Sequence, residues 1–242
     1  MRKFLLAIIV GAALAAGASA QEPLTRPDVE RIVHDYLLKN PQVIYDAIQE
    51  LQRTQQIAAA AQQKATIAEH WGEIFAGRED LVGGDPAGDV TLVEFFDYNC
   101  HFCRDMAAGV RALLKQDPKL RVVFKDIPIL GPGSVMAAKA ALAAARQAKY
   151  TELHFALMQV KELNRETVLK TASEVGLDTV RLARDMEDPA IAAAIDRNLA
   201  LARELGVEGT PAFVVGDTLV PGATEIKALA ELIGKQRETA AN

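Results

Sequence analysis

The sequence contains two cysteines, and two residues separate them in the motif Cys100-His101-Phe102-Cys103. Residues 90–96, just before the motif, are apolar, β-branched or aromatic apart from one glutamate, and this run predicts a buried strand. After the motif, apolar residues recur at helical spacing at Met106, Val110 and Leu113. The two cysteines are therefore predicted to lie where a strand ends and a helix begins.

A pair of thiols at that position favours redox chemistry. The N-terminus of a helix offers unpaired N–H groups and the positive end of the helix dipole, and both stabilise a thiolate, the reactive form of cysteine. We expect Cys100 to be the nucleophile of a redox-active disulfide and Cys103, one helical turn further in, to be the resolving thiol. A protonated His101 would add positive charge beside the Cys100 thiolate, and His101 and Phe102 lie where such motifs tune the reduction potential.

The two cysteines could also form a structural disulfide or bind a metal ion. A disulfide that closes a four-residue loop removes little chain entropy, so it would stabilise the fold weakly. A four-cysteine zinc site needs a second cysteine pair, which the sequence lacks. A Cu(I) site on the two thiolates and His101 stays open as a side role, because this soft ion favours thiolates. No resident metal or cofactor is expected.

Three stretches of the sequence resemble the DsbA-like branch of the thioredoxin superfamily: Glu94-Phe95-Phe96, the Cys-x-x-Cys motif, and Thr210-Pro211 followed by Ala-Phe. Within that branch, the N-terminal helical extension and the segment Phe-Phe-Asp-Tyr-Asn-Cys look most like ScsC-type (suppressor of copper sensitivity) proteins. The resemblance covers residues 29–234. Family members commonly have proline after the first cysteine, where this chain has His101, so the redox potential of the family cannot be carried over.

The resemblance implies an α/β thioredoxin fold with an inserted all-helical domain and an N-terminal helical arm. It implies that Thr210 and Pro211 form the cis-proline loop, which binds the substrate chain beside Phe102. It also implies that Glu94 lies beneath the disulfide, relays a proton for Cys103 and has a basic partner. Lys125, a second charge inside an apolar strand, is the candidate partner, because a buried charge needs one. Two outward-facing side chains are the alternative.

The chain is expected to divide into five parts. Residues 1–20 have a positive start, an apolar stretch too short to span a bilayer and a small-x-small cleavage site, which predicts a signal peptide and a periplasmic location, a retained membrane anchor being the alternative. The other parts are a helical arm and linker, the first part of the thioredoxin fold, the inserted helical domain and the second part with the cis-proline loop, over residues 21–82, 83–131, 132–189 and 190–242.

The arm is predicted to be two helices joined at Asn40-Pro41, each with apolar residues at helical spacing, ahead of a turn-rich linker over residues 83–88. Trp71, Ile74 and Phe75 are expected to dock its end on the redox domain. The apolar stripes need a partner, either the redox domain of the same chain, on which the arm would fold back, or another copy of the chain. ScsC-like and DsbC-like relatives use such segments for self-association, so we expect a homo-oligomer, with a trimer favoured.

The formal net charge is −5 and no dense basic run is present, which argues against nucleic acid or an anionic membrane surface as the partner. We expect a thiol-disulfide oxidoreductase that acts on protein disulfides, as an isomerase or reductase kept reduced by a membrane redox partner. A DsbA-like dithiol oxidase and a copper-handling protein are the alternatives. His154, in the expected helical domain, is predicted to be a surface or packing residue.

Overall fold

The computed structural model describes residues 23–77 and 81–240, so the predicted signal peptide lies outside the described residues. The chain divides into two compact units, residues 1–55 and 56–242. In the part of the chain that the structure describes, no helix combines the length and the apolar character needed to cross a membrane.

The first unit consists of α1 (Arg26–Lys39) and the first half of α2 (Gln42–Glu69). A capping box between Thr25 and Asp28 starts α1, and Asn40 ends it ahead of Pro41. The prediction of two helices joined at Asn40-Pro41 is therefore confirmed. No residue of α1 is buried, and half-exposed apolar side chains lie along both helices, including Val29, Ile32, Tyr36, Ile44, Ile48 and Leu51.

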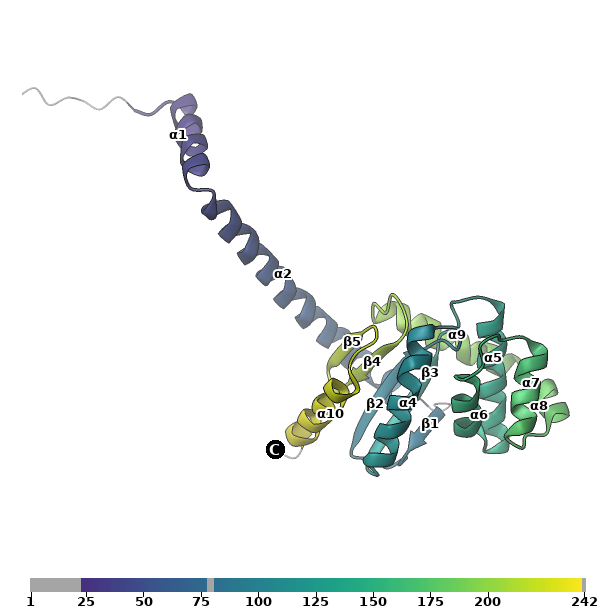
Figure 1. Ribbon diagram of the computed structural model, residues 1–242. Coiled ribbons are helices and arrows are strands. Elements are labelled where there is room, and N and C mark those ends of the chain that lie inside the picture. The colour runs from purple at the N-terminus through teal and green to yellow at the C-terminus, as the bar shows by residue number, and fades with distance from the viewer. Residues whose placement is uncertain (1–22, 78–80, 241–242) are drawn as a thin grey trace, which may run out of the picture. The chain divides into compact units, whose positions relative to one another are not determined.

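A five-stranded sheet in the order β1-β3-β2-β4-β5 forms the centre of the second unit (Figure 1). Strands β2 and β3 are parallel, and the other neighbouring strands are antiparallel. The prediction of a parallel pair around the helix that carries the cysteines is confirmed. The five strands are β1 (Leu81–Gly84), β2 (Val90–Phe96), β3 (Leu120–Asp126), β4 (Ala212–Val215) and β5 (Thr218–Pro221).

The sequence pattern predicted a turn-rich linker over residues 83–88 and did not indicate the first strand, β1. Gly83 and Gly84 instead end the edge strand β1, which pairs with β3. Gly84 has a φ of +79°, and a Cβ at this position would overlap with the carbonyl oxygen of Leu120. Glycine is therefore required here by its backbone conformation and by a close approach between strands, and not by a flexible linker.

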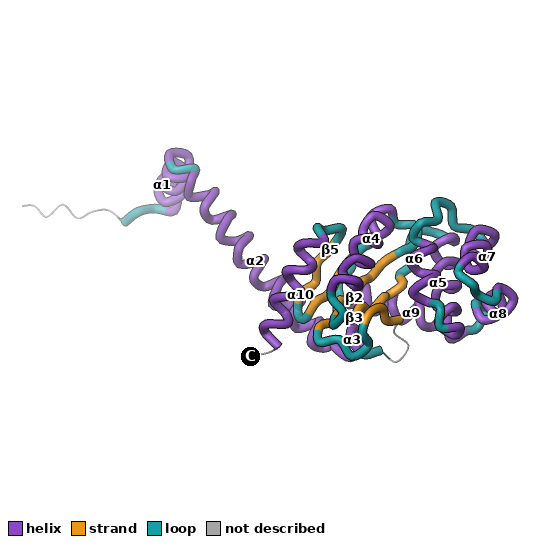
Figure 2. Tube along the Cα trace, turned by 60° about the horizontal axis from the view of Figure 1, so that its bottom comes forward, coloured by secondary structure: helices purple, strands orange, loops and turns teal. Residues whose placement is uncertain are grey.

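Helices cover both faces of the sheet (Figures 1 and 2). On one face, α4 (His101–Gln116) and α10 (Ile226–Ala240) pack against the side of β2 that carries Leu92 and Phe96. On the other face, α3 (Trp71–Phe75) and α9 (Pro189–Glu204) pack against the side that carries Val93 and Phe95. The alternation along β2 separates two apolar clusters.

The docking of α3 was predicted correctly for two of its three residues. Ile74 and Phe75 are buried against the sheet, whereas Trp71 is 48% exposed and stacks on Phe75 with ring centroids 4.2 Å apart. The last turns of α2 are held by the buried Ile67 and by an ion pair of 2.8 Å between Lys64 Nζ and an aspartate oxygen in the turn between β4 and β5.

Between β3 and α9 the chain forms the inserted helical domain, as the resemblance implied (Figure 1). Its first helix, α5 (Pro132–Ala144), buries all of its alanines, and their small side chains let α6 (Tyr150–Leu157), α7 (Arg165–Glu174), α8 (Thr179–Asp185) and α9 all pack against it. A 3₁₀ turn (Ala145–Gln147) follows α5.

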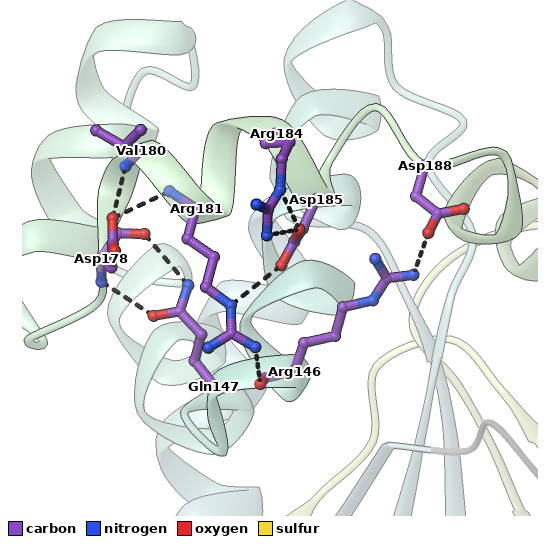
Figure 3. A network of polar contacts seen from close by, with 8 residues as sticks. All are labelled: Arg146, Gln147, Asp178, Val180, Arg181, Arg184, Asp185 and Asp188. Carbon is purple, nitrogen blue, oxygen red and sulfur yellow. Dashed lines mark hydrogen bonds and ion pairs between the residues drawn. The ribbon is translucent and has the colours of Figure 1, made fainter.

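A polar network fastens α8 and the N-cap of α9 to the 3₁₀ turn that follows α5 (Figure 3). Arg146 forms an ion pair of 2.7 Å with Asp188, and its carbonyl oxygen accepts a hydrogen bond of 2.9 Å from Arg181. Asp185 is buried, and its carboxylate accepts hydrogen bonds of 3.1 and 3.0 Å from Arg184 and lies 3.5 Å from Arg181. A buried carboxylate is tolerated when cations satisfy it in this way.

Candidate active site

The sheet topology brings distant segments of the chain together at one end of the strands. Because β3 runs parallel to β2, the two strands end at the same edge, and because β4 is antiparallel to β2, it begins there. The cysteine motif follows β2, and Thr210 and Pro211 precede β4. The sheet therefore joins residues that lie 110 positions apart in the sequence.

Cys100 is the N-cap residue of α4, with extended backbone angles of φ −70° and ψ 118°. Its sulfur accepts a hydrogen bond of 3.4 Å from the backbone N–H of Cys103. In the thiol form it donates to the carbonyl oxygen of Thr210 at 3.2 Å. Both cysteines are buried free thiols, and the Thr210–Pro211 peptide bond is cis, which confirms that prediction.

These contacts divide the two thiols by acidity. The hydrogen bond with the Cys103 side chain, together with bonds from the Thr210 side chain and from the backbone N–H groups of Cys103 and Phe102, lowers the pKa of Cys100 to about 5, although burial opposes the shift. The same bond to Cys100 and burial raise the pKa of Cys103. At neutral pH the site therefore holds a thiolate at Cys100 and a thiol at Cys103.

His101 points towards its own helix. Its Nε2 lies 3.6 Å from a carboxylate oxygen of Asp105, and its ring stacks on Phe102 with centroids 4.0 Å apart. Among the described residues, His101 is not one of the groups that lower the pKa of Cys100. Hydrogen bonds from the Cys103 and Thr210 side chains and from backbone N–H groups account for that shift instead.

An apolar groove of about 400 Å³ lies beside the cis-proline loop. Phe102, Val207, Thr210, Leu219 and Pro221 are among the residues that line it. Phe102 is half-exposed, so its ring is open to a bound chain. The groove therefore places apolar surface next to the Cys100 sulfur.

Glu94 lies in the middle of β2 and is fully buried on the α4 side of the sheet. Burial, with a further effect of the Cys100 thiolate, raises its pKa to about 8. In the parallel register Glu94 pairs with Phe124, whereas Lys125 pairs with Phe95, so Glu94 and Lys125 point to opposite faces of the sheet. The predicted ion pair between them is therefore wrong.

Lys125 has a different role. It is buried on the α9 side, and its Nζ donates a hydrogen bond of 2.8 Å to the backbone carbonyl of Glu73 in α3. Arg121, further along the same strand, donates at 2.7 Å to the carbonyl of Phe75. These two cations satisfy carbonyl groups at the end of α3 and so hold this helix on the sheet.

Two aspartates that the sequence analysis did not select lie beside Glu94. Asp97 follows β2, Asp126 ends β3, and both are buried. Within the described residues, neither carboxyl oxygen of Asp126 has a hydrogen-bond partner, and burial together with Asp97 and Glu94 raises its pKa. The signal was available: an acidic residue stands at the end of each of two apolar strands that were predicted to be parallel.

His154 packs beneath the site in an aromatic cluster with Phe96, Phe124 and Tyr150. Its Nδ1 lies 3.1 Å from the hydroxyl of Tyr98, and burial lowers its pKa to about 3. Of the two roles that were predicted for His154, the structure supports packing, because only 1% of the residue is exposed.

In the described ranges, one group of three side chains has the spacing of metal ligands. His70, Glu73 and Glu204, at the corner of α2 and α3 and the end of α9, offer ligand atoms within 4.8 Å of one another. The two carboxylates are exposed and already lie 3.3 and 3.4 Å from His70 Nδ1. This group does not include Cys100, Cys103 or His101.

A parallel β-α-β unit with Cys-x-x-Cys at the start of its helix, facing a cis-proline loop, defines a thioredoxin-like redox protein. The family model described as "DSBA-like thioredoxin domain" matches residues 91–234, and the chain belongs to this family of thiol-disulfide oxidoreductases. A second model, described as "Copper resistance protein ScsC N-terminal domain", matches residues 26–59 in the arm.

Solved structures support the same assignment. A thioredoxin-like oxidoreductase from Silicibacter pomeroyi DSS-3 is 49% identical, covers 69% of this chain and 97% of its own, and has a TM-score of 0.67. Proteus mirabilis ScsC in a transitional conformation is 26% identical over 88% of this chain and 97% of its own, with a TM-score of 0.68. A periplasmic thioredoxin-like protein from Salmonella enterica serovar Typhimurium is 30% identical over 69% and 95%, with a TM-score of 0.64.

Among curated proteins, the chain is 30% identical over 162 residues to a Na(+)/H(+) antiporter NhaA from Herminiimonas arsenicoxydans. The match takes in 65% of this chain and only 26% of the antiporter. The chain therefore spans about a quarter of the length of the curated relative that it matches.

Proposed function

We propose that this protein is exported to the periplasm and acts there as an isomerase or reductase of protein disulfides. The observation that carries the proposal is the division of the two thiols. Cys100 caps α4 and is a thiolate at neutral pH, while the neighbouring Cys103 keeps its proton. Cys100 can therefore attack a disulfide directly, whereas Cys103 must first lose its proton.

The chemistry follows from this division. The Cys100 thiolate attacks one sulfur of a substrate disulfide, the S–S bond breaks, and a mixed disulfide forms while a substrate thiolate leaves. In reduction, Cys103 loses its proton and attacks the Cys100 sulfur, which releases the second substrate thiolate and leaves the Cys100–Cys103 disulfide. In isomerisation, another substrate thiolate attacks the mixed disulfide and restores Cys100 without net electron transfer.

Glu94 would take the proton of Cys103. The Cys100 thiolate helps to raise the pKa of Glu94, and its charge disappears when the mixed disulfide forms. The pKa of Glu94 should therefore fall when the mixed disulfide forms, so that Glu94 releases its own proton to solvent and its carboxylate can accept the proton of Cys103. A buried carboxyl beneath the disulfide is suited to that transfer.

Substrate binding would use the cis-proline loop and the groove beside it. The carbonyl of Thr210 lies next to the Cys100 sulfur, and Pro211 begins the turn into β4. An extended substrate chain could bond to this backbone and place an apolar side chain against Phe102. Unfolded or wrongly bonded proteins expose such side chains, whereas folded proteins bury most of them.

The arm would join several copies of the chain, with a trimer favoured. Apolar side chains of α1 and α2 are exposed, and residues 26–59 match the ScsC N-terminal domain. Several active sites in one particle raise the local concentration of reactive thiols around a bound substrate, which isomerisation requires. Because an isomerase works from its reduced form, a membrane redox partner would keep Cys100 and Cys103 reduced.

The periplasmic location is supported by the predicted signal peptide and by one of the similar structures, which is described as a periplasmic thioredoxin-like protein. A disulfide-permissive compartment also lets the dithiol cycle through its oxidised state.

The experiment compares refolding of scrambled ribonuclease with refolding of reduced ribonuclease. The reduced full chain should restore activity to the scrambled substrate, and the oxidised chain should accelerate refolding of the reduced substrate far less. Deletion of residues 21–65 should leave a monomer that still reduces simple disulfides but isomerises scrambled ribonuclease poorly. Faster oxidation than isomerisation by the full chain would instead identify a DsbA-like oxidase.

A copper-handling role is the second candidate, and the match of the arm to the ScsC N-terminal domain, which is described as part of a copper resistance protein, is the observation in its favour. The Cys100 and Cys103 thiolates could hold Cu(I). Stoichiometric Cu(I) should then protect Cys100 from an alkylating reagent, whereas a purely redox site would be alkylated at the same rate with and without the ion.

A further inference from the structure

The carboxylate of Asp97, the first residue after β2, accepts four hydrogen bonds close to the cysteines. The residue is only 1% exposed. One carboxylate oxygen accepts bonds of 2.6 Å from the backbone N–H of Asn99 and 2.6 Å from the hydroxyl of Ser134. The other oxygen accepts bonds of 2.8 and 2.9 Å from the backbone N–H groups of Ile129 and Leu130.

These four donors belong to two segments. Asn99 lies in the short loop that leads from β2 to Cys100, whereas the other three belong to the loop after β3 and the first turn of α5. The carboxylate thus ties the loop before Cys100 to the first helix of the inserted domain. The backbone of Asp97 contributes as well, because its carbonyl oxygen accepts a hydrogen bond of 3.1 Å from the Cys100 N–H.

We propose that Asp97 is the positioning residue of the thiol site: its carboxylate holds the loop before Cys100 in the one conformation that places this cysteine at the N-cap of α4. The inference rests on the proposed role of Cys100 as the nucleophile. Asp97 acts through the placement of the sulfur, since its side chain bonds to the surrounding loops and not to the thiols.

The position demands a carboxylate. All four partners donate, and only a carboxylate offers two oxygens that both accept. An asparagine would turn its NH₂ group towards one of the two pairs of donors. Ser134 could rotate its hydroxyl to accept, but the backbone N–H groups of Asn99, Ile129 and Leu130 cannot, so at least one would lose its buried partner.

Two effects of such a change on Cys100 oppose each other. Removal of a negative charge near a thiolate would lower the pKa of Cys100, whereas loss of the N-cap position would weaken the N–H bonds to the sulfur and raise it. Asp97 is not among the groups that act directly on the pKa of Cys100, while the N–H groups of Cys103 and Phe102 are. The positioning effect should therefore decide the sign.

The test is the thiolate absorbance of the reduced full chain against pH for three proteins: wild type, Asp97→Asn and Asp185→Asn. Asp185 is the matched control, because it is also buried, and its partners Arg181 and Arg184 lie on α8. Both variants should lose stability. Asp97→Asn should raise the Cys100 pKa by about one unit or more, a tenfold change in the acid dissociation constant, and Asp185→Asn should leave it unchanged.

An unchanged or lowered Cys100 pKa in folded Asp97→Asn would overturn the inference. If Asp97→Asn does not fold, Ser134→Ala removes one of the four donors and keeps the carboxylate. This variant should raise the pKa of Cys100 by a smaller amount, and no rise would contradict the inference in the same way. A wild-type Cys100 pKa near the ordinary thiol value would instead remove the proposed role of Cys100, so the two failures can be told apart.

Discussion

The arm and the redox core place apolar and polar side chains in opposite ways. In the arm, valine, isoleucine, leucine and tyrosine side chains of α1 and α2 are exposed, and α1 buries no residue. In the core, Glu94, Asp97, Asp126 and His154 are each about 1% exposed beneath two cysteines. Exposed apolar side chains and buried polar or charged groups both cost free energy in a folded chain unless other groups cover or pair them.

The difference shows where each region does its work. Exposed apolar stripes on helices are stabilised when another surface covers them, which supports the proposal that the arm joins copies of the chain. Buried acids with shifted pKa values are common at functional sites, which supports the proposed proton transfer between Glu94 and Cys103.

The sharpest division within the core lies between its two thiols. Cys100→Ser should abolish disulfide exchange, because the attacking thiolate is gone. Cys103→Ser should still attack but should accumulate the mixed disulfide, because the resolving thiol is missing. Gel electrophoresis without reductant, after incubation with scrambled ribonuclease, would separate the two variants. Trapping by Cys100→Ser in place of Cys103→Ser would reverse the assigned roles.

The arm can be broken at one of its exposed apolar residues. Ile48→Lys should dissociate the proposed oligomer, because burial of each isoleucine contributes roughly 1.5–3 kcal/mol and the substitution would place a charge in the interface. Gln49→Lys, at the next position, is the control and should remain assembled. Light scattering would report the mass, and the scrambled-substrate assay should fall in parallel. Equal masses for the two variants would mean that the stripe is covered in another way.

The buried acid of the core should make stability depend on pH. The pKa of Glu94 is raised to about 8 in the folded protein, so the folded state holds a proton that the unfolded chain releases near pH 4.5. The sign follows: stability falls as pH rises from about 4.5 to 8. Glu94→Gln should remove this loss, gaining on the wild type by up to about 1.4 kcal/mol per pH unit.

Urea unfolding of both reduced proteins at several pH values would measure that difference. The comparison is made between variants because Cys100 and His154, whose pKa values are lowered, change stability with the opposite sign in both proteins. A difference that does not change with pH would show that Glu94 is already ionised in the folded state. Slower resolution of the mixed disulfide by Glu94→Gln would support its role as a base.

The smallest effect on catalysis should come from the other face of the sheet. Lys125→Met removes the bond to the Glu73 carbonyl and should cost about 1–3 kcal/mol of stability. Turnover and the pH profile of resolution should stay unchanged, because Lys125 points away from Glu94. A shift of the pH profile as large as that of Glu94→Gln would mean that the two charges are coupled after all.

Local patterns were sufficient for much of the fold and of the site. The apolar run ahead of Cys100, the helical spacing after it and the Thr210-Pro211 pair each depend on neighbours in sequence, and the structure has the strand, the helix and the cis bond where they were predicted. The arm divides at Asn40-Pro41 for the same reason, since proline restricts the residue before it.

The failures all concern the register or the packing of distant segments. Whether Lys125 faces Glu94 depends on which residues of β2 and β3 are paired, and spacing within one strand does not reveal that. Gly83 and Gly84 looked like a linker because close backbone approach and flexibility both select glycine. The position of Asp97 and Asp126 at the ends of two apolar strands could have marked them, but their hydrogen-bond partners and burial depend on loops and helices far along the chain.

Hydrogen bonds from the Cys103 side chain, from the Thr210 side chain and from the N–H groups at the start of α4 hold Cys100 as a thiolate, and thiolate absorbance of the reduced wild-type protein against pH measures this state. We expect a midpoint near pH 5 for Cys100, with Cys103 still protonated at neutral pH. A Cys100 midpoint above about 8, close to an unperturbed thiol, would contradict it.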